Sequence, residues 1–149
     1  MSPRHASEPS AERRFRALGL SMLPAIFPRD ELVVRLATPE ALTRGAIVAY
    51  PGSGGRVLAH RILDASGEHD LLIRGDFLDG LEDVPRDAVA YVVVRVEGRF
   101  GSWSPEDLRG RLLAHMALST GGPYAVVRTG VRQLLRVALA LRRSHAAWG

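Results

Sequence analysis

The chain has 149 residues, 46% of them hydrophobic and 24% charged, which is typical of one globular domain with an appendage. It contains no cysteine, which excludes disulfides, zinc ribbons and thiol catalysis. All 20 basic residues are arginine, and the net charge of +4 is too small to indicate nucleic-acid binding by itself.

Residues 1–14 are polar and show no hydrophobic periodicity, so we expect them to form a disordered lead. They lack the apolar stretch of a secretory signal. No apolar run in the sequence is long enough to cross a bilayer. The sequence therefore predicts a cytoplasmic protein, and contact with a membrane surface is the alternative.

Residues 15–100 carry short apolar runs separated by glycine, proline and aspartate, which predicts a mainly β core. Turn residues between closely spaced runs favour a curled antiparallel sheet or small barrel. Hairpin loops are expected at Pro51–Gly55 and Ser66–Glu68. The expected strands are Phe15–Leu20, Glu31–Ala37, Ala46–Tyr50, Arg56–Ala65, Asp70–Gly75 and Val89–Glu97.

Residues 104–143 are expected to form a C-terminal helical hairpin. Ser104 provides a hydroxyl cap, Pro105 suits the first helical position, and Asp107 places an acid three residues after the cap. The first helix should end near Ser119, before a Gly-Gly-Pro stop. The second should run from about residue 124 to residue 143.

The second helix has an apolar face and a stripe of arginines four residues apart, at Arg128, Arg132 and Arg136. We favour packing of its apolar face against the domain, with the arginines in water. The alternative is a basic amphipathic helix lying on anionic lipid.

Three chemical groups follow one another along the chain, each at the edge of an apolar run. They are the hydroxyl of Ser21, the imidazole of His60 and the carboxylate of Asp76, the groups used in nucleophilic acyl transfer. Because the chain has no lysine and arginine stays protonated, histidine is the natural base. Asp79 and Asp83 compete with Asp76 for the role of orienting the imidazole. The histidines lack metal-ligand spacing, so neither a metal nor a cofactor is expected.

The order of these segments resembles type I signal peptidases, in the branch that uses histidine in place of the catalytic lysine. This branch is found in archaea, in the endoplasmic reticulum and in some spore-forming bacteria. The likeness covers roughly residues 18–96. The segments that carry it are Ser21-Met22-Leu23-Pro24, Pro28-Arg29-Asp30-Glu31-Leu32-Val33-Val34, Arg44-Gly45-Ala46-Ile47-Val48, Ala59-His60-Arg61-Ile62, and Arg74-Gly75-Asp76 followed by Asp83.

The resemblance implies a serine endopeptidase that cleaves a precursor or leader peptide after small residues. Ser21 would attack the carbonyl, His60 would move the proton, and Asp76 would orient His60, with Asp83 in reserve. Backbone N–H groups of Leu20 and Ser21 would hold the oxyanion. The substrate would be an extended peptide paired with a strand edge.

The chain departs from the family pattern at three positions. Arg29 replaces a glycine, Ala46 replaces an acid, and Gly19 offers no hydroxyl near the nucleophile. A second hypothesis is a non-catalytic peptide-binding module on the same fold, and the separation of Ser21 from His60 would distinguish the two. A self-cleaving repressor is disfavoured, because such proteins use lysine and need a DNA-binding domain.

Overall fold

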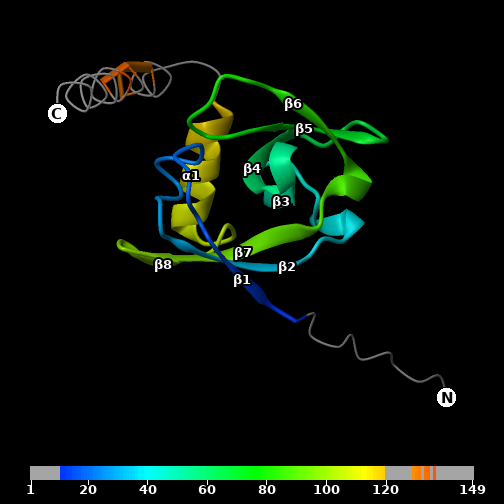
Figure 1. The fold of residues 1–149 in the computed structure, drawn as a ribbon, viewed down its shortest axis with the longest axis horizontal. Coiled ribbons are helices and arrows are strands. Elements are labelled where there is room, and N and C mark those ends of the chain that lie inside the picture. Colours follow the sequence, from blue (N-terminus) through cyan, green and yellow to red (C-terminus); the bar gives the residue numbers. More distant parts are fainter. Residues whose placement is uncertain (1–10, 120–128, 132, 135, 137–149) are drawn as a thin grey trace.

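The computed structural model describes residues 11–119, 129–131, 133, 134 and 136. Within these residues, eight strands form one antiparallel sheet in the order β1-β2-β7-β3-β4-β5-β6, with β8 paired to β7. The sheet curls into a half-barrel around β3 and β4, as Figure 1 shows, and this confirms the predicted mainly β class. The strands are β1 (Arg13–Arg16), β2 (Glu31–Leu36), β3 (Ile47–Pro51), β4 (Val57–Asp64), β5 (Asp70–Arg74), β6 (Glu82–Pro85), β7 (Tyr91–Gly98) and β8 (Gly101–Trp103).

The strands β2, β3, β4, β5 and β7 lie where the sequence predicts them, to within two residues at each end. The two expected hairpin loops connect β3 to β4 and β4 to β5. Two strands, β6 and β8, were missing from the prediction. β6 reads Glu-Asp-Val-Pro and β8 has three residues, so neither carries an apolar alternation that could reveal it.

The segment from Phe15 to Leu20 was expected to be one strand, and this is wrong. β1 begins at Arg13, inside the predicted lead, and ends at Arg16. The chain then leaves the strand at Ala17, whose N–H donates to the Asp30 carbonyl and whose carbonyl accepts from Arg29. These two bonds hold the ends of a loop together, and Ser21 lies within it.

Arg29 has φ +76°, in the left-handed region that favours glycine. Glycine is the residue that the signal-peptidase pattern carries at this position. Arg29 therefore adopts a backbone conformation that costs a non-glycine residue roughly 1–2 kcal/mol.

The core has two sides because side chains alternate along β3. Ile47 joins a cluster with Met22, Ile26 and Trp103 on one side. Val48 and Tyr50 join the other side, whose members include Ile62, Leu71, Ile73 and Val84.

The helix α1 (Leu108–Leu118) stands beside the curled sheet, in yellow in Figure 1. It ends at the predicted place, but it begins three residues later than expected. Asp107 is the N-cap, because its carboxylate accepts from the backbone N–H groups of Gly110 and Ser104, both at 2.8 Å. The Arg74 guanidinium ties β5 to α1 by donating to the Ala117 carbonyl at 2.9 Å.

In the predicted second helix, residues 129–131, 133, 134 and 136 are helical, and the rest lies outside the described residues. None of the helices that the structure describes is both long and apolar enough to cross a membrane.

Candidate functional site

The three segments singled out in the sequence meet at the end of β5. Arg61 on β4 pairs with Arg74 on β5, and the antiparallel register continued by one residue sets His60 across from Gly75. Gly75 is also where the Ser21 backbone rests: a Cβ on Gly75 would lie 2.6 Å from the Ser21 carbonyl oxygen. The next amide but one, from Phe77, donates to the same oxygen at 2.8 Å. Ser21 therefore packs on Gly75, and His60 precedes Arg61, the first β4 residue that is paired with β5.

The imidazole of His60 is buried, with 3% of the residue exposed, on the face of β4 that also carries Leu58 and Ile62. Its Nδ1 lies 2.8 Å from the Tyr50 hydroxyl. That hydroxyl donates to Glu82 Oε2 at 2.9 Å. A phenol hydroxyl has one hydrogen to donate, and in Tyr50 it is donated to Glu82. The Tyr50 oxygen must therefore accept a hydrogen bond from Nδ1–H of His60. This tautomer leaves Nε2 as the unprotonated nitrogen, the form that a general base needs.

Burial lowers the pKa of His60, while the carboxylates of Glu82 and Asp76 act in the opposite direction. Glu82 Oε1 lies 3.6 Å from His60 Nδ1, close enough to stabilise a positive charge on the ring. Burial, followed by Glu82, raises the pKa of Tyr50, so the phenol stays protonated and keeps its place between Glu82 and His60.

Asp76 has a different partner from the one that the sequence suggested. Its two carboxylate oxygens accept from Nε and Nη2 of Arg61, at 2.8 and 2.7 Å, and both side chains are buried. Arg61 also donates to the Gly45 carbonyl at 2.8 Å. Asp76 thus anchors the loop after β5 to β4, one residue away from His60.

Asp83, the reserve candidate, is exposed on β6. Successive strand residues face opposite sides, so the geometry that turns Glu82 toward Tyr50 turns Asp83 away from it. The carboxylate next to His60 is Glu82, one residue before the aspartate chosen from the sequence.

Sequence reasoning missed Tyr50 and Glu82 for different reasons. Val48 and Tyr50 alternate on β3, and Val48 is the register partner of His60, so strand pairing could have placed Tyr50 on the imidazole's face. Glu82 had no comparable signal, because β6 is too short and polar to be recognised as a strand.

Ser21 lies at the end of a groove of about 660 Å³, which we call the serine groove. The residues 15–19 form one wall and residues 56–59 form the other. β4 pairs with β3 along Val57–Arg61 but with β5 only from Arg61 onward, so within the described chain the other edge of Val57–His60 is unpaired. The remaining lining residues are Ser21, Met22, Ile26, Leu32 and Ala49.

The backbone amides of Leu20 and Ser21 donate no hydrogen bond to any described residue. They lie in the loop between β1 and β2, where Ser21 lines the serine groove and Leu20 precedes it in the chain. Unpaired amides next to a hydroxyl are suitable donors for an oxyanion.

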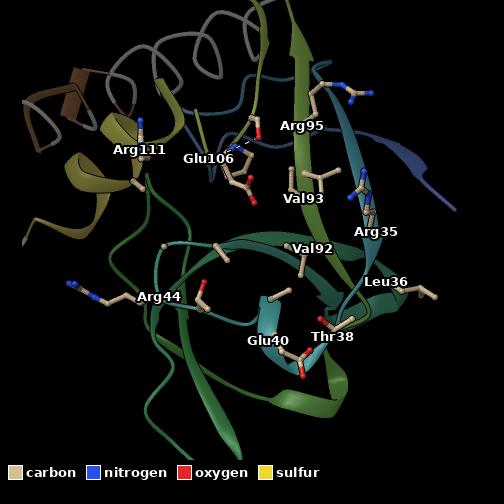
Figure 2. A pocket seen from close by; sticks show the side chains of 18 of the residues that line it. Arg35, Leu36, Thr38, Glu40, Arg44, Val92, Val93, Arg95, Glu106 and Arg111 are labelled. Carbon is tan, nitrogen blue, oxygen red and sulfur yellow. Dashed lines mark hydrogen bonds between the residues drawn. The ribbon is translucent and has the colours of Figure 1, made fainter. Parts of the chain in front are cut away.

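A larger groove of about 810 Å³ lies between β2, β7, the loop before β3 and α1, and we call it the helix groove. Figure 2 shows Arg35 on β2, Arg95 on β7 and Arg111 on α1 around it. Its lining mixes both charge signs, and Arg35 pairs with Glu12. Ser21 does not line it, and His60 lines neither this groove nor the serine groove. The larger groove is therefore separate from the candidate site.

Among the described residues, no cluster of three or more histidine or acidic side chains is arranged to hold a metal ion. No family model, curated protein or solved structure matches this chain.

Proposed function

We propose that this protein is a serine endopeptidase that acts through Ser21 and His60. One observation carries the proposal: His60 is buried with Nδ1 bonded to Tyr50, which leaves Nε2 ready to accept a proton, and the Ser21 backbone packs on Gly75, the residue after the last β5 position paired with β4. The order of the motifs, which resembles signal peptidases, supports the same assignment.

In the proposed reaction, Ser21 Oγ attacks the carbonyl carbon of a peptide bond, and its proton passes to His60 Nε2. The amides of Leu20 and Ser21 stabilise the oxyanion. The imidazolium then protonates the leaving amine as the C–N bond breaks. Water, deprotonated by the same nitrogen, releases the acyl group from Ser21 and restores the hydroxyl.

Glu82 and Tyr50 are assigned positioning roles. Tyr50 fixes the tautomer of His60. Glu82 accepts the hydrogen bond of the Tyr50 hydroxyl, and the negative charge of Glu82 stabilises the imidazolium of His60. In this arrangement His60 is oriented by a tyrosine, whereas the sequence suggested that Asp76 orients it directly. Asp76 acts one step further away, by holding Arg61 and the loop that supports Ser21.

The substrate class is an extended peptide, because the unpaired edge of β4 runs along the serine groove. Backbone pairing with such an edge gives affinity without regard to sequence. Ala49 and Ala59 line the groove, and cleavage after small residues remains the expectation that the resemblance supplies. Location in the cytoplasm, and contact of the C-terminal helix with lipid, also remain predictions.

The test is incubation of the purified chain with a mixture of synthetic peptides that contain Ala–Ala bonds, read by mass spectrometry. We expect cleavage by the intact protein and none by Ser21→Ala or His60→Gln. Two exposed residues provide matched controls: Ser102→Ala on β8 and His69→Ala in the loop before β5 should cleave normally.

Circular dichroism of each variant separates loss of chemistry from loss of fold. Normal cleavage by folded Ser21→Ala would refute the proposal. If the intact protein binds these peptides without cutting them, the peptide-binding module is the better description.

A further inference from the structure

The charged residues that line the serine groove are all positive. Arg16 on β1 and Arg56 at the start of β4 are the charged residues among those that line it, and none of the lining residues is acidic. They come from opposite walls of the groove, and both are exposed. An extended peptide lying there would pass both Arg16 and Arg56.

Neither guanidinium is neutralised by a described residue. Most arginines of the described chain bond to a carboxylate or a carbonyl, or stack on an aromatic ring, whereas Arg16 and Arg56 do neither. Glu31 lies opposite Arg16 in the β1–β2 register, but its carboxylate pairs with Arg14. The two cations are therefore available to a ligand.

The strand geometry sets where such a ligand's charge would lie. Arg56 precedes His60 by four residues, at the start of β4. At a rise of about 3.3 Å per residue, an extended peptide alongside β4 places a side chain near Arg56 about four residues from the bond at Ser21.

We propose that Arg16 and Arg56 select peptides that carry an acidic side chain about four residues from the bond that is cut. The apolar lining near Ser21 takes small or apolar side chains, and the charged end takes a carboxylate. A carboxylate fits guanidinium groups in a two-bond geometry that lysine cannot offer. This inference rests on the proposed function, because it deepens the specificity of the same groove.

The test measures binding apart from cleavage. The probe is a fluorescein-labelled ten-residue peptide of alanine and valine with a central Ala–Ala bond and one glutamate, placed three, four or five residues from that bond on either side. A matched set carries glutamine instead. Fluorescence anisotropy with the full-length Ser21→Ala chain reports binding while the peptide stays intact.

We expect the glutamate peptide at one of these positions to bind about three- to tenfold tighter than its glutamine partner at low salt. The preference should shrink in 0.5 M NaCl, because the charges are exposed. Arg56→Gln should lower it, and Arg16→Gln with Arg56→Gln should remove it. Arg111→Gln is the matched control, since Arg111 is an exposed arginine in the helix groove.

Charge reversal excludes a purely structural role. Arg56→Glu should bind the same peptide with lysine in place of glutamate better than the original protein does. Equal binding of glutamate and glutamine peptides, or an equal loss in Arg111→Gln, would overturn the inference.

The two proposals fail in different ways. If the intact chain cuts Ala–Ala peptides without regard to the acid, the peptidase stands and the acidic preference is wrong. If Ser21→Ala shows the arginine-dependent preference but the intact chain cuts nothing, the preference stands and the peptidase is wrong.

Discussion

A tyrosine hydroxyl, and not a carboxylate, makes the direct hydrogen bond to His60. The Tyr50 hydroxyl donates its hydrogen bond to Glu82, so its oxygen accepts a hydrogen bond from Nδ1–H of His60. The Glu82 carboxylate still acts on the His60 ring through its charge, because Oε1 lies 3.6 Å from Nδ1, but it makes no direct hydrogen bond to the ring. A buried imidazole held in this way keeps one nitrogen for chemistry and commits the other to structure.

Tyr50→Phe removes the acceptor of Nδ1–H and leaves a buried donor unsatisfied. Such a loss costs roughly 1–3 kcal/mol, so we expect kcat/KM for a cleaved peptide to fall about 5- to 150-fold. Tyr91→Phe makes the same change on β7 and should leave the rate unaltered. Adding Glu82→Gln to Tyr50→Phe should cost little more, because the connection is already broken. Full additivity of the two changes would show that Glu82 does not act on His60 through Tyr50.

The low pKa of His60 predicts a pH dependence of activity. Burial holds it below the ordinary value of 6.5, so the neutral base persists in mildly acidic solution. The acidic limb of kcat/KM should therefore have its midpoint below pH 6.5. A midpoint above that value would show that Glu82 and Asp76 outweigh burial.

The same shift affects stability. The unfolded chain binds a proton that the folded one excludes, so the free energy of unfolding should fall as pH drops through 6.5 toward the folded pKa. Urea denaturation of the protein and of His60→Gln across this interval isolates the contribution of His60.

The candidate residues illustrate what one sequence can predict. Ser21 and His60 were chosen as candidates because each stands out from an apolar run, and the face shared by Leu58, His60 and Ile62 follows from simple alternation. The sequence did not predict that Glu82 is the carboxylate close to His60 Nδ1. Four acidic residues within the loop and β6 look alike in sequence, and only their pairing in space distinguishes Asp76 on Arg61 from Glu82 on Tyr50.

The loop after β5 is the element that joins Ser21 to the sheet. Gly75 has no room for a side chain, since a Cβ would meet the Ser21 carbonyl at 2.6 Å and Leu78 at 3.0 Å. The backbone of Ser21 is thus positioned by close packing as well as by the Phe77 hydrogen bond.

Gly75→Ala should displace Ser21 and lower kcat/KM at least about tenfold, with a loss of stability of roughly 1–3 kcal/mol from overpacking. Gly80→Ala is the control in the same loop, because nothing lies within 4 Å of its added Cβ. Urea denaturation and peptide cleavage measure the two effects. Equal behaviour of the two variants would show that Ser21 does not depend on this contact.

The strands with apolar alternation were predictable as elements, and β6 and β8 were not. Helix α1 shows the limit on boundaries: Ser104 and Pro105 form a plausible start, but Asp107 competes for the cap and bonds two amides. Local signals identify that a helix begins, while the choice between neighbouring caps depends on which carboxylate reaches the free amides.

Across the molecule, the buried Arg61–Asp76 pair connects β4, the Gly75 loop and, through Gly45, the turn before β3. Replacing one partner leaves the other charge unpaired in the core. The pair therefore matters more for the arrangement of the sheet than for proton transfer.

Arg61→Leu should destabilise the fold by about 3–5 kcal/mol, measured by chemical denaturation. The double variant Arg61→Leu with Asp76→Leu should be more stable than either single one, because no lone charge remains buried. Arg35→Gln, which breaks an exposed pair with Glu12, should hardly move the denaturation midpoint. A double variant no better than the singles would refute this account.

The unpaired edge of β4 also bears on how copies of this chain behave toward one another. An open strand edge is a template on which any extended chain can add, and proteins often guard such edges with charge. Arg56 stands where this edge begins, and Arg16 lines the same groove. Two molecules approaching edge to edge would bring like charges together, so the arginines that we assign to substrate choice would also keep concentrated protein from aggregating.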